Sequence, residues 1–261
     1  MSGIYPALRD LLAAQEPVVL ATVIEGPNAG AKLMATGADD VVGSLGDADL
    51  DRVVTRDALG ELAAGRTGVR AYGEHGEARE DAVRVFIETF APPPKMIIFG
   101  AVDFTAALAR AGKLLGFRVT VADAREVFAT PRRFPMADEV LVEWPNRVLE
   151  RVGPLLGPAD AVCVLTHDNK FDVPALMGAV ETKVGYIGAM GSRRTSDERE
   201  VRLRAEGMTA EQLDRIMAPI GLDIGSRTPE ETAISVCAEI IARRTGKLAP
   251  SLRDGAGPIH A

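Results

Sequence analysis

The clearest pattern of apolar and polar residues in this chain lies within residues 95–123. The stretch opens with a short, uninterrupted apolar run, which is typical of a strand buried on both faces of a parallel sheet. After Gly100, apolar residues recur at helical spacing up to Gly116, and glycine commonly follows the end of a helix. The apolar segment 117–122 predicts a second strand that ends at Asp123. This order of elements predicts the first unit of a Rossmann-type domain.

The same alternation of strands and helices continues through the C-terminal half, so we expect a Rossmann-like parallel sheet there. A last helix begins after Thr228, where Pro229 and Glu231 complete a capping-box pattern. Further strands are predicted at residues 140–142, 160–166 and 184–187, and further helices at 173–180, 192–206 and 210–216.

The N-terminal half shows shorter strands separated by turn residues, a pattern that predicts a small α+β domain with an antiparallel sheet. A proline-rich segment at 91–94 marks the domain boundary. We therefore expect an α+β domain at 1–91, a Rossmann-like domain at 95–246 and a flexible, Gly/Pro-rich tail at 247–261. Within the first domain, helices are predicted at 4–12 and 47–64, and strands at 17–24, 32–35, 40–42, 69–72 and 83–88.

Composition narrows the classes of function. The net charge of −7 argues against nucleic acid as the main partner, because neutralising phosphates requires basic residues. No apolar run is long enough to span a membrane, and the opening residues lack a secretory pattern, so we expect a cytoplasmic location. Cys163 and Cys237 both lie in apolar segments and are predicted to be buried, reduced thiols. No metal-ligand spacing is present, and homodimerisation is expected from base rates alone.

Polar residues follow the strand that ends near residue 166. Ligands of open parallel sheets bind at the carboxyl ends of the strands, and Thr166, His167 and Asp168 fall at such an end. His167 and Asp168 are therefore candidates for ligand contact or acid–base chemistry. The alternative interpretation is that the histidine only orders its loop through Asp168.

The next strand end carries glycines and two arginines. Gly188 and Gly191 would let a ligand approach the backbone, and Ser192, Arg193 and Arg194 open the following helix. A helix N-terminus beside two guanidinium groups predicts an anion site. The alternative is that Ser192 caps a helix whose arginines are solvated.

The turn after the first strand of this domain is a weak match to a dinucleotide fingerprint. Gly100 and Ala101 are candidates for backbone contacts to a cofactor, and Asp123 lies where an acid would bind a ribose hydroxyl. Val102, however, stands at the second glycine position of the fingerprint, and Asp103 adds a negative charge that could instead cap the helix. NAD(P) binding therefore stays open as an alternative.

Several segments together resemble the XdhC/CoxI family, the accessory proteins of xanthine dehydrogenase and related molybdenum hydroxylases. The resemblance covers nearly all of residues 95–245. It is carried by the Gly100 turn with FRVTVAD, Arg133-Phe134-Pro135, Leu165-Thr166-His167-Asp168, Gly191-Ser192-Arg193-Arg194 and PIGLDIGSRTPEE.

The resemblance implies a cytosolic factor that binds molybdenum cofactor and assists its sulfuration or insertion into a partner apoenzyme, with a separate protein as sulfur donor. It implies a cofactor-handling chaperone in place of a turnover enzyme. The chain departs from the family at Val102 and Asp103, at Thr195, where a lysine is usual, and at residues 46–49, where a G-G-C-x-E element is usual. Two other hypotheses are an NAD(P)-dependent oxidoreductase and a non-catalytic ligand-sensing or scaffold protein.

Overall fold

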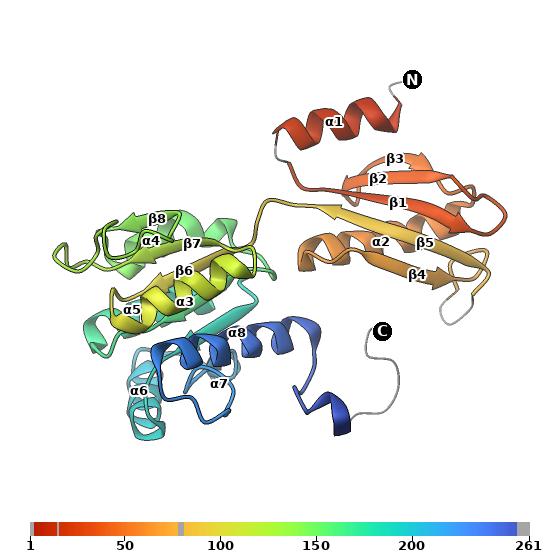
Figure 1. Ribbon diagram of the computed structural model, residues 1–261. Helices are drawn as coiled ribbons and strands as arrows, with labels where there is room; N and C mark the ends of the chain where they lie inside the picture. Colours follow the sequence, from red (N-terminus) through yellow and green to blue (C-terminus); the bar gives the residue numbers. More distant parts are fainter. Residues whose placement is uncertain (1–2, 15, 78–80, 255–261) are drawn as a thin grey trace. The chain divides into compact units, whose positions relative to one another are not determined.

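A computed structural model describes residues 3–14, 16–77 and 81–254 of the chain. The chain divides into two compact units, Met1–Pro92 and Pro93–Ala261. Each unit is built around a sheet of its own, so the two are described separately (Figure 1).

The N-terminal unit is a five-stranded antiparallel sheet in the order β3-β2-β1-β5-β4. Alternate residues of β1 point to opposite faces: Val19 packs in the core that includes α2, whereas Val18 and Leu20 pack in a smaller cluster with α1. The small α+β domain predicted from the sequence is thus confirmed. Its elements are α1 (Ile4–Ala14), β1 (Val18–Glu25), β2 (Lys32–Gly37), β3 (Asp40–Ser44), α2 (Ala48–Ala64), β4 (Gly68–Tyr72) and β5 (Val83–Phe90).

The C-terminal unit is a six-stranded, entirely parallel sheet in the order β11-β10-β9-β6-β7-β8. The first strand of the unit lies in the middle, and the chain winds outward from it on both sides, which is the doubly wound Rossmann topology. The predicted fold class is confirmed. The elements are β6 (Lys95–Phe99), α3 (Asp103–Leu114), β7 (Arg118–Ala122), β8 (Glu139–Leu141), α4 (Pro145–Val152), η1 (Gly153–Leu155), β9 (Ala161–Val164), α5 (Asn169–Val180), β10 (Tyr186–Ala189), α6 (Arg193–Ala205), α7 (Ala210–Leu213), β11 (Ile216–Met217), α8 (Pro229–Thr245) and η2 (Leu252–Asp254).

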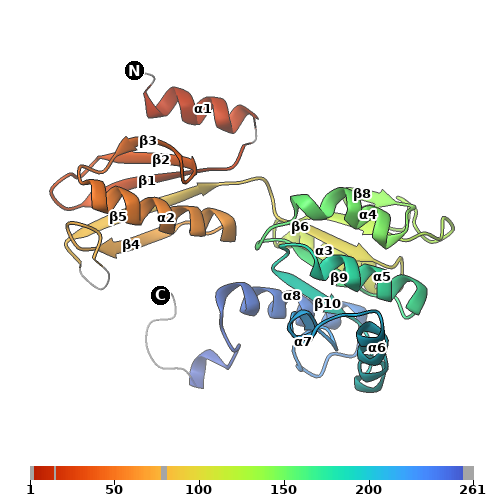
Figure 2. The same ribbon diagram turned by 180° about the vertical axis from the view of Figure 1, so that it is seen from behind.

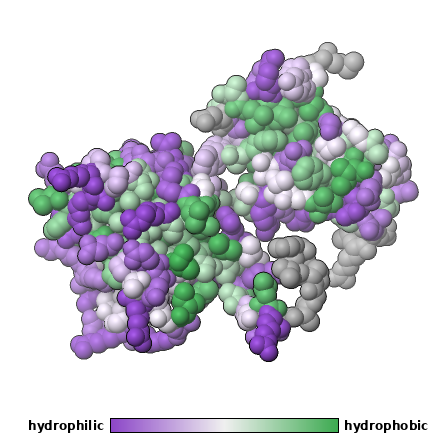
Figure 3. Space-filling model, viewed as in Figure 1, coloured by the Kyte–Doolittle hydropathy of each residue, from purple (hydrophilic) through white to green (hydrophobic). Residues whose placement is uncertain are grey.

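Helices cover both faces of the parallel sheet. Met96 and Ile98 of β6 point into the core shared with α3 and α8, and Ile97 and Phe99 point into the core shared with α4, α5 and α6. Figure 1 shows the α3–α8 face in front, and Figure 2 shows α4 and α5 from behind. Because both faces of β6 are buried, its sequence is a continuous apolar run with no alternation. In Figure 3, polar residues cover most of this unit, and apolar patches lie over α3 and α8.

Two predicted helices have different bounds in the structure, and a third helix was not predicted. Helix α5 begins at Asn169 and not near residue 173, because the Asp168 side chain caps it there. The helix predicted at 210–216 ends at Leu213, and the apolar pair that follows it forms the short edge strand β11. Helix α4 was not predicted, although it carries proline at its first position. Of the predicted tail, 247–254 is described, and 255–261 lies outside the described residues.

Candidate functional site

Three helices begin in a row along the carboxyl edge of the parallel sheet. Helices α4, α5 and α6 follow β8, β9 and β10 and lie on the same face, with α5 packed against both of its neighbours. Their N-cap residues are Trp144, Asp168 and Ser192. Each helix N-terminus carries partial positive charge, so this edge favours an anionic ligand. The topological switch point between β6 and β9 lies at the same edge.

The Gly100 turn is closed by its own protein groups. Gly100 has φ +108°, and a Cβ atom there would lie 2.5 Å from Thr166 Cγ2, so only glycine fits. The Val102 amide donates to the Thr105 hydroxyl at 3.4 Å, and that hydroxyl donates to the Gly100 carbonyl at 2.5 Å. Thr105 stands at the third glycine position of the fingerprint. Its side chain fills the space inside the turn and hydrogen-bonds the backbone groups there, which a glycine could not do. The glycine is needed for packing against Thr166.

Asp123 is fully engaged inside the protein. It is 3% exposed and accepts four hydrogen bonds: from the amides of Ala101 (2.8 Å) and Arg125 (2.9 Å), and from Arg125 Nε (2.9 Å) and Nη2 (2.7 Å). Burial acts to raise its pKa, but these hydrogen bonds and the guanidinium charge outweigh burial and lower the pKa. Four bonds use the accepting capacity of a carboxylate. The predicted ribose contact of Asp123 and the predicted cofactor contact of the Ala101 amide therefore do not fit this geometry.

Asp103 is not the helix cap that the sequence allowed. Val102 occupies the N-cap position of α3, and Asp103 is the first helical residue. Its carboxylate is exposed and lies 3.7 Å from Arg133 Nη2. Its negative charge weighs against an anion at the start of α3.

A buried polar network joins the loops after β9 and β10. The Thr166 hydroxyl donates to Asp172 Oδ1, and Arg199 Nη2 donates to Asp172 Oδ2 at 2.9 Å and to the Met190 carbonyl at 2.7 Å. Arg199 is 2% exposed, and its Nε and Nη1 atoms have no hydrogen-bond partner among the described residues. Burial raises the pKa of Asp172 to about 6, with Arg199 acting in the opposite direction. The network fixes Thr166 and Met190 at neighbouring strand ends.

The start of α6 is open, in contrast to the Gly100 turn. Ser192 Oγ accepts from the Thr195 amide at 3.1 Å, while the amides of Arg193 and Arg194 have no acceptor within the described part of the chain. Both arginine side chains are exposed, and Arg194 pairs with Glu198 at 3.0 Å. Beneath this turn, Arg199 Nη1 would lie 3.6 Å from a Cβ atom built on Gly191. The region therefore combines two amides, a helix dipole and three guanidinium groups.

The structure places the remaining sequence candidates as follows. His167 is exposed, and Asp168 is exposed as well, accepting from the Lys170 amide at 3.0 Å. No hydrogen bond joins His167 to Asp168 in the described structure, so the histidine does not order its loop in that way. Gly188 lies inside β10, where a Cβ atom would lie 2.5 Å from Ile220. Its lack of a side chain is explained by packing against Ile220, and a ligand contact at Gly188 stays a prediction.

An aromatic and cationic stack lies beside this row of helices. The Trp144 and Phe171 rings stack with centroids 4.6 Å apart at 15°. The Arg125 guanidinium lies 5.6 Å from the Phe171 ring and 4.7 Å from the Phe128 ring. Trp144 is 47% exposed and Phe128 is 41% exposed, whereas Phe171 is buried. Large aromatic rings half exposed at the rim of a candidate site are available for contact with a ligand or partner.

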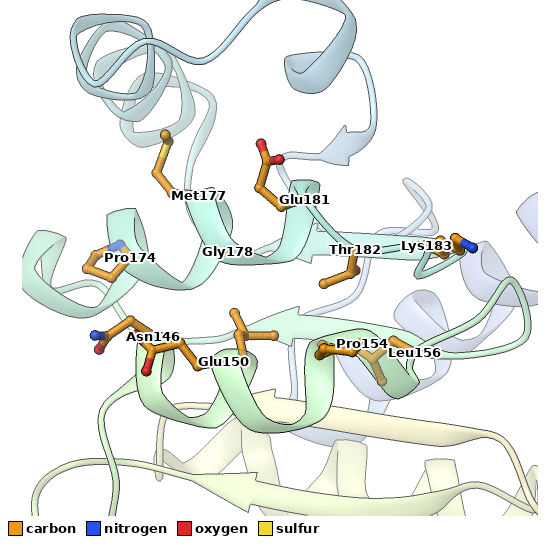
Figure 4. A pocket seen from close by; sticks show the side chains of 12 residues that line it. Asn146, Glu150, Pro154, Leu156, Pro174, Met177, Gly178, Glu181, Thr182 and Lys183 are labelled. Atoms are coloured by element: carbon orange, nitrogen blue, oxygen red, sulfur yellow. The ribbon is translucent and has the colours of Figure 1, made fainter.

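A cavity of about 640 Å³ lies along the groove between α4 and α5. It runs from Asn146 and Pro174, near the start of the helices, to Thr182 and Lys183 beyond the end of α5 (Figure 4). It begins within one helical turn of the Trp144–Phe171 stack. From there the cavity extends toward the C-terminal ends of the two helices, away from the row of helix N-termini.

Three further observations concern metal ligands, membrane-spanning helices and the two thiols. They contain no group of three or more His, Cys, Asp or Glu side chains arranged to hold a metal ion. In the same residues, none of the helices has the length and apolar character needed to cross a bilayer. Both cysteines are buried and reduced, as predicted, and burial raises the pKa of Cys237 to about 11 and that of Cys163 further.

Comparison with known families assigns both units of the chain to one family. The XdhC Rossmann domain matches residues 96–240, more than half of the chain, and the XdhC and CoxI family matches residues 11–73. The chain belongs to the XdhC/CoxI family. The second match lies in the N-terminal unit and the first in the C-terminal unit.

Three curated relatives share parts of this XdhC/CoxI sequence. The uncharacterized protein YqeB of Escherichia coli is 29% identical over 86% of the chain and 43% of its own length. A probable xanthine dehydrogenase subunit of Bacillus subtilis is 33% identical over 63% of the chain and 47% of its own length. The molybdenum cofactor insertion chaperone PaoD of Escherichia coli is 38% identical over 32% of the chain and 26% of its own length. The chain spans less than half the length of each of these proteins.

A solved structure shares the fold of this XdhC/CoxI chain. A crystal structure of a xanthine dehydrogenase from Bacillus halodurans superposes with a TM-score of 0.64 and 24% identity, covering 92% of this chain and 66% of the other. At this identity the similarity concerns the fold alone.

Sequence reasoning missed the residues that join the candidate loops. The charged pattern of residues 192–206 does not distinguish Arg199 from its solvated neighbours, although Arg199 is the residue that holds Asp172. The signal in the sequence is that Arg199 stands four residues before the apolar Leu203, and so on the same face of α6. Trp144 and Phe171 were not singled out, because their stacking joins two helices that are distant in sequence.

Proposed function

We propose that this chain is a maturation factor that binds molybdenum cofactor and assists its sulfuration or its insertion into a xanthine dehydrogenase-type molybdenum hydroxylase. The observation that carries the proposal is the open N-terminus of α6, where two amides without acceptors in the described chain lie above the buried Arg199. Membership of the XdhC/CoxI family and the name of the relative PaoD support the same conclusion. The role is that of a cofactor-handling chaperone, not of a turnover enzyme.

The residues present fit the two ends of the molybdenum cofactor. Its phosphate is an anion, and the amides of Arg193 and Arg194 with their guanidinium groups would hold it. His167 and Lys170, exposed at the start of α5, face the same edge of the sheet and would contact the rest of the molecule. The bound group would itself supply the metal and its redox chemistry. The protein's part is to bind, orient and release it.

The burial of both cysteines implies that a separate protein would supply the sulfur for sulfuration. Cys163 and Cys237 are buried, and their raised pKa values keep them as thiols, whereas sulfur transfer requires a thiolate. In place of the usual cysteine element, Asp47 caps α2 by accepting from the Asp49 and Leu50 amides. A sulfur donor protein would therefore have to act on the bound cofactor. A homodimeric state and a cytoplasmic location stay predictions.

Equilibrium ultrafiltration of the full chain with purified molybdopterin tests the proposal. We expect Arg193→Ala/Arg194→Ala to weaken binding about tenfold or more, because charge-assisted hydrogen bonds to the phosphate are lost. The matched control is Arg204→Ala, which removes an exposed arginine from the far end of the same helix. Unchanged affinity in the double variant, or no association of the unmodified chain at micromolar concentration, would contradict the proposal.

A further inference from the structure

We infer that Trp144, backed by Phe171, is a stacking platform for the flat heteroaromatic ring of the ligand whose anionic end lies at α6. The inference rests on the proposed function for the anionic end and adds the part of the site that recognises the ring. It names a residue to which neither the family matches nor the names of the relatives assign a role.

The first argument is the position of Trp144 at a helix start. It is the N-cap residue of α4 and makes no side-chain capping bond. Serine, aspartate or asparagine at this position would stabilise the helix by accepting a hydrogen bond from one of its first amides. The chain instead holds its only tryptophan there, with 47% of the residue exposed. A site that departs from the local rule and exposes a large aromatic ring is typical of a binding function.

The second argument is that the ring is held in place before any ligand arrives. One face of the indole packs on Phe171 at 4.6 Å, so its exposed area belongs to the other face and the edges. Phe171 is itself contacted by the Arg125 guanidinium, which Asp123 holds through two of its nitrogens. A fixed ring binds a flat guest with little loss of side-chain entropy.

The third argument is the path from Trp144 to the anion site. Arg199 Nη2 donates to Asp172, in the same first turn of α5 as Phe171, and to the carbonyl of Met190, two residues before the cap of α6. The start of α5 therefore separates the open end of α6 from the indole. One ligand with a negative end and a flat ring would cross this turn, where Lys170 is exposed. A pterin and a purine nucleotide share that chemistry.

The experiment uses the full chain and titration calorimetry with three probes: purified molybdopterin, AMP and inorganic phosphate. We expect Trp144→Leu to weaken molybdopterin binding roughly 5- to 100-fold, the range for loss of one aromatic stacking partner. Trp144→Phe should retain most of the affinity, because phenylalanine keeps an aromatic ring that can stack on the ligand. Inorganic phosphate should bind all three proteins equally, since its contacts lie at α6.

The outcomes separate this inference from the proposed function. Molybdopterin binding that is equal in the unmodified chain and in Trp144→Leu would overturn the platform and leave the proposed function standing. If the unmodified chain binds AMP but not molybdopterin, and Trp144→Leu weakens the AMP complex, the platform stands and the proposed function fails. Loss of client activation by Trp144→Leu with unchanged affinity for all probes would make Trp144 a partner contact and overturn the platform.

Discussion

Replacing Arg199 by methionine gives the sharpest test of the polar network. The substitution keeps an unbranched side chain of similar length but leaves the Asp172 carboxylate buried without a cation. Breaking a buried ion pair by removing one partner costs about 3–5 kcal/mol, a large part of the ~5–15 kcal/mol that stabilises a typical domain. We therefore expect Arg199→Met to lower the free energy of unfolding of the C-terminal unit by an amount in this range near neutral pH.

The loss should depend on pH, and the sign follows from Asp172. Its pKa in the folded chain, about 6, already lies above the ordinary value of 3.8 because of burial, and removing Arg199 raises it further. A carboxyl group with a raised folded pKa stabilises the fold fully below its unfolded pKa and loses that contribution as pH rises through the folded pKa. The variant should therefore be markedly weaker at about pH 8 than at about pH 5, where Asp172 is protonated and needs no cation.

Urea unfolding followed by tryptophan fluorescence measures this change in the right unit. Trp144 is the only tryptophan, lies in the C-terminal unit and stacks on Phe171, the neighbour of Asp172 in sequence. Arg204→Met is the control, because Arg204 forms an exposed i,i+4 pair with Glu200, which contributes at most about 0.5 kcal/mol. A loss below about 1 kcal/mol at pH 8, or an equal loss at both pH values, would refute the reasoning.

Three further predictions concern the turn, its acid and the thiols. Gly100→Ala should cost at least about 2 kcal/mol in urea unfolding, because its Cβ meets Thr166 at a positive φ, while Gly157→Ala, with open space around it, should change little; equal effects would contradict the packing argument. Because the pKa of Asp123 is lowered in the folded chain, the ionised carboxylate stabilises the fold fully above the ordinary pKa of 3.8, and this contribution is lost as pH falls through the folded pKa. Asp123→Asn should therefore flatten the curve of stability against pH in acid, and an unchanged curve would contradict a stabilising role of the Asp123 carboxylate. Cys163 and Cys237 should react with a thiol reagent only on unfolding, and rapid labelling of the native chain would show that one of them is accessible.

The fold class could be predicted from the sequence because burial determines where apolar residues stand in each strand and helix. The run at 96–99 is apolar throughout since both faces of β6 are covered, and the repeat that follows it forms α3. The edge strand β11 was missed because two residues paired on one side leave almost no periodic signal. The start of α5 was placed late because polar residues fill its first turn.

The candidate site was predicted only in part, because side-chain partners cannot be inferred from spacing. Ser192, Arg193 and Arg194 do open a helix at the carboxyl edge of the sheet, as the pattern indicated. Gly100 and Gly188 were interpreted as ligand contacts, but contacts with Thr166 and Ile220 explain them. Asp123 was interpreted as a ribose acceptor, and nothing in its position along the chain reveals that Arg125 folds back onto it.

The ion pair between Arg125 and Asp123 has a consequence for the binding of abundant dinucleotides. NAD and NADP would have to displace the Arg125 guanidinium from the buried Asp123 before their sugars could bind, and that displacement loses two charge-assisted hydrogen bonds. The chain can thus keep the architecture of a dinucleotide domain while its own Arg125 takes the position at which the acid would bind a ribose.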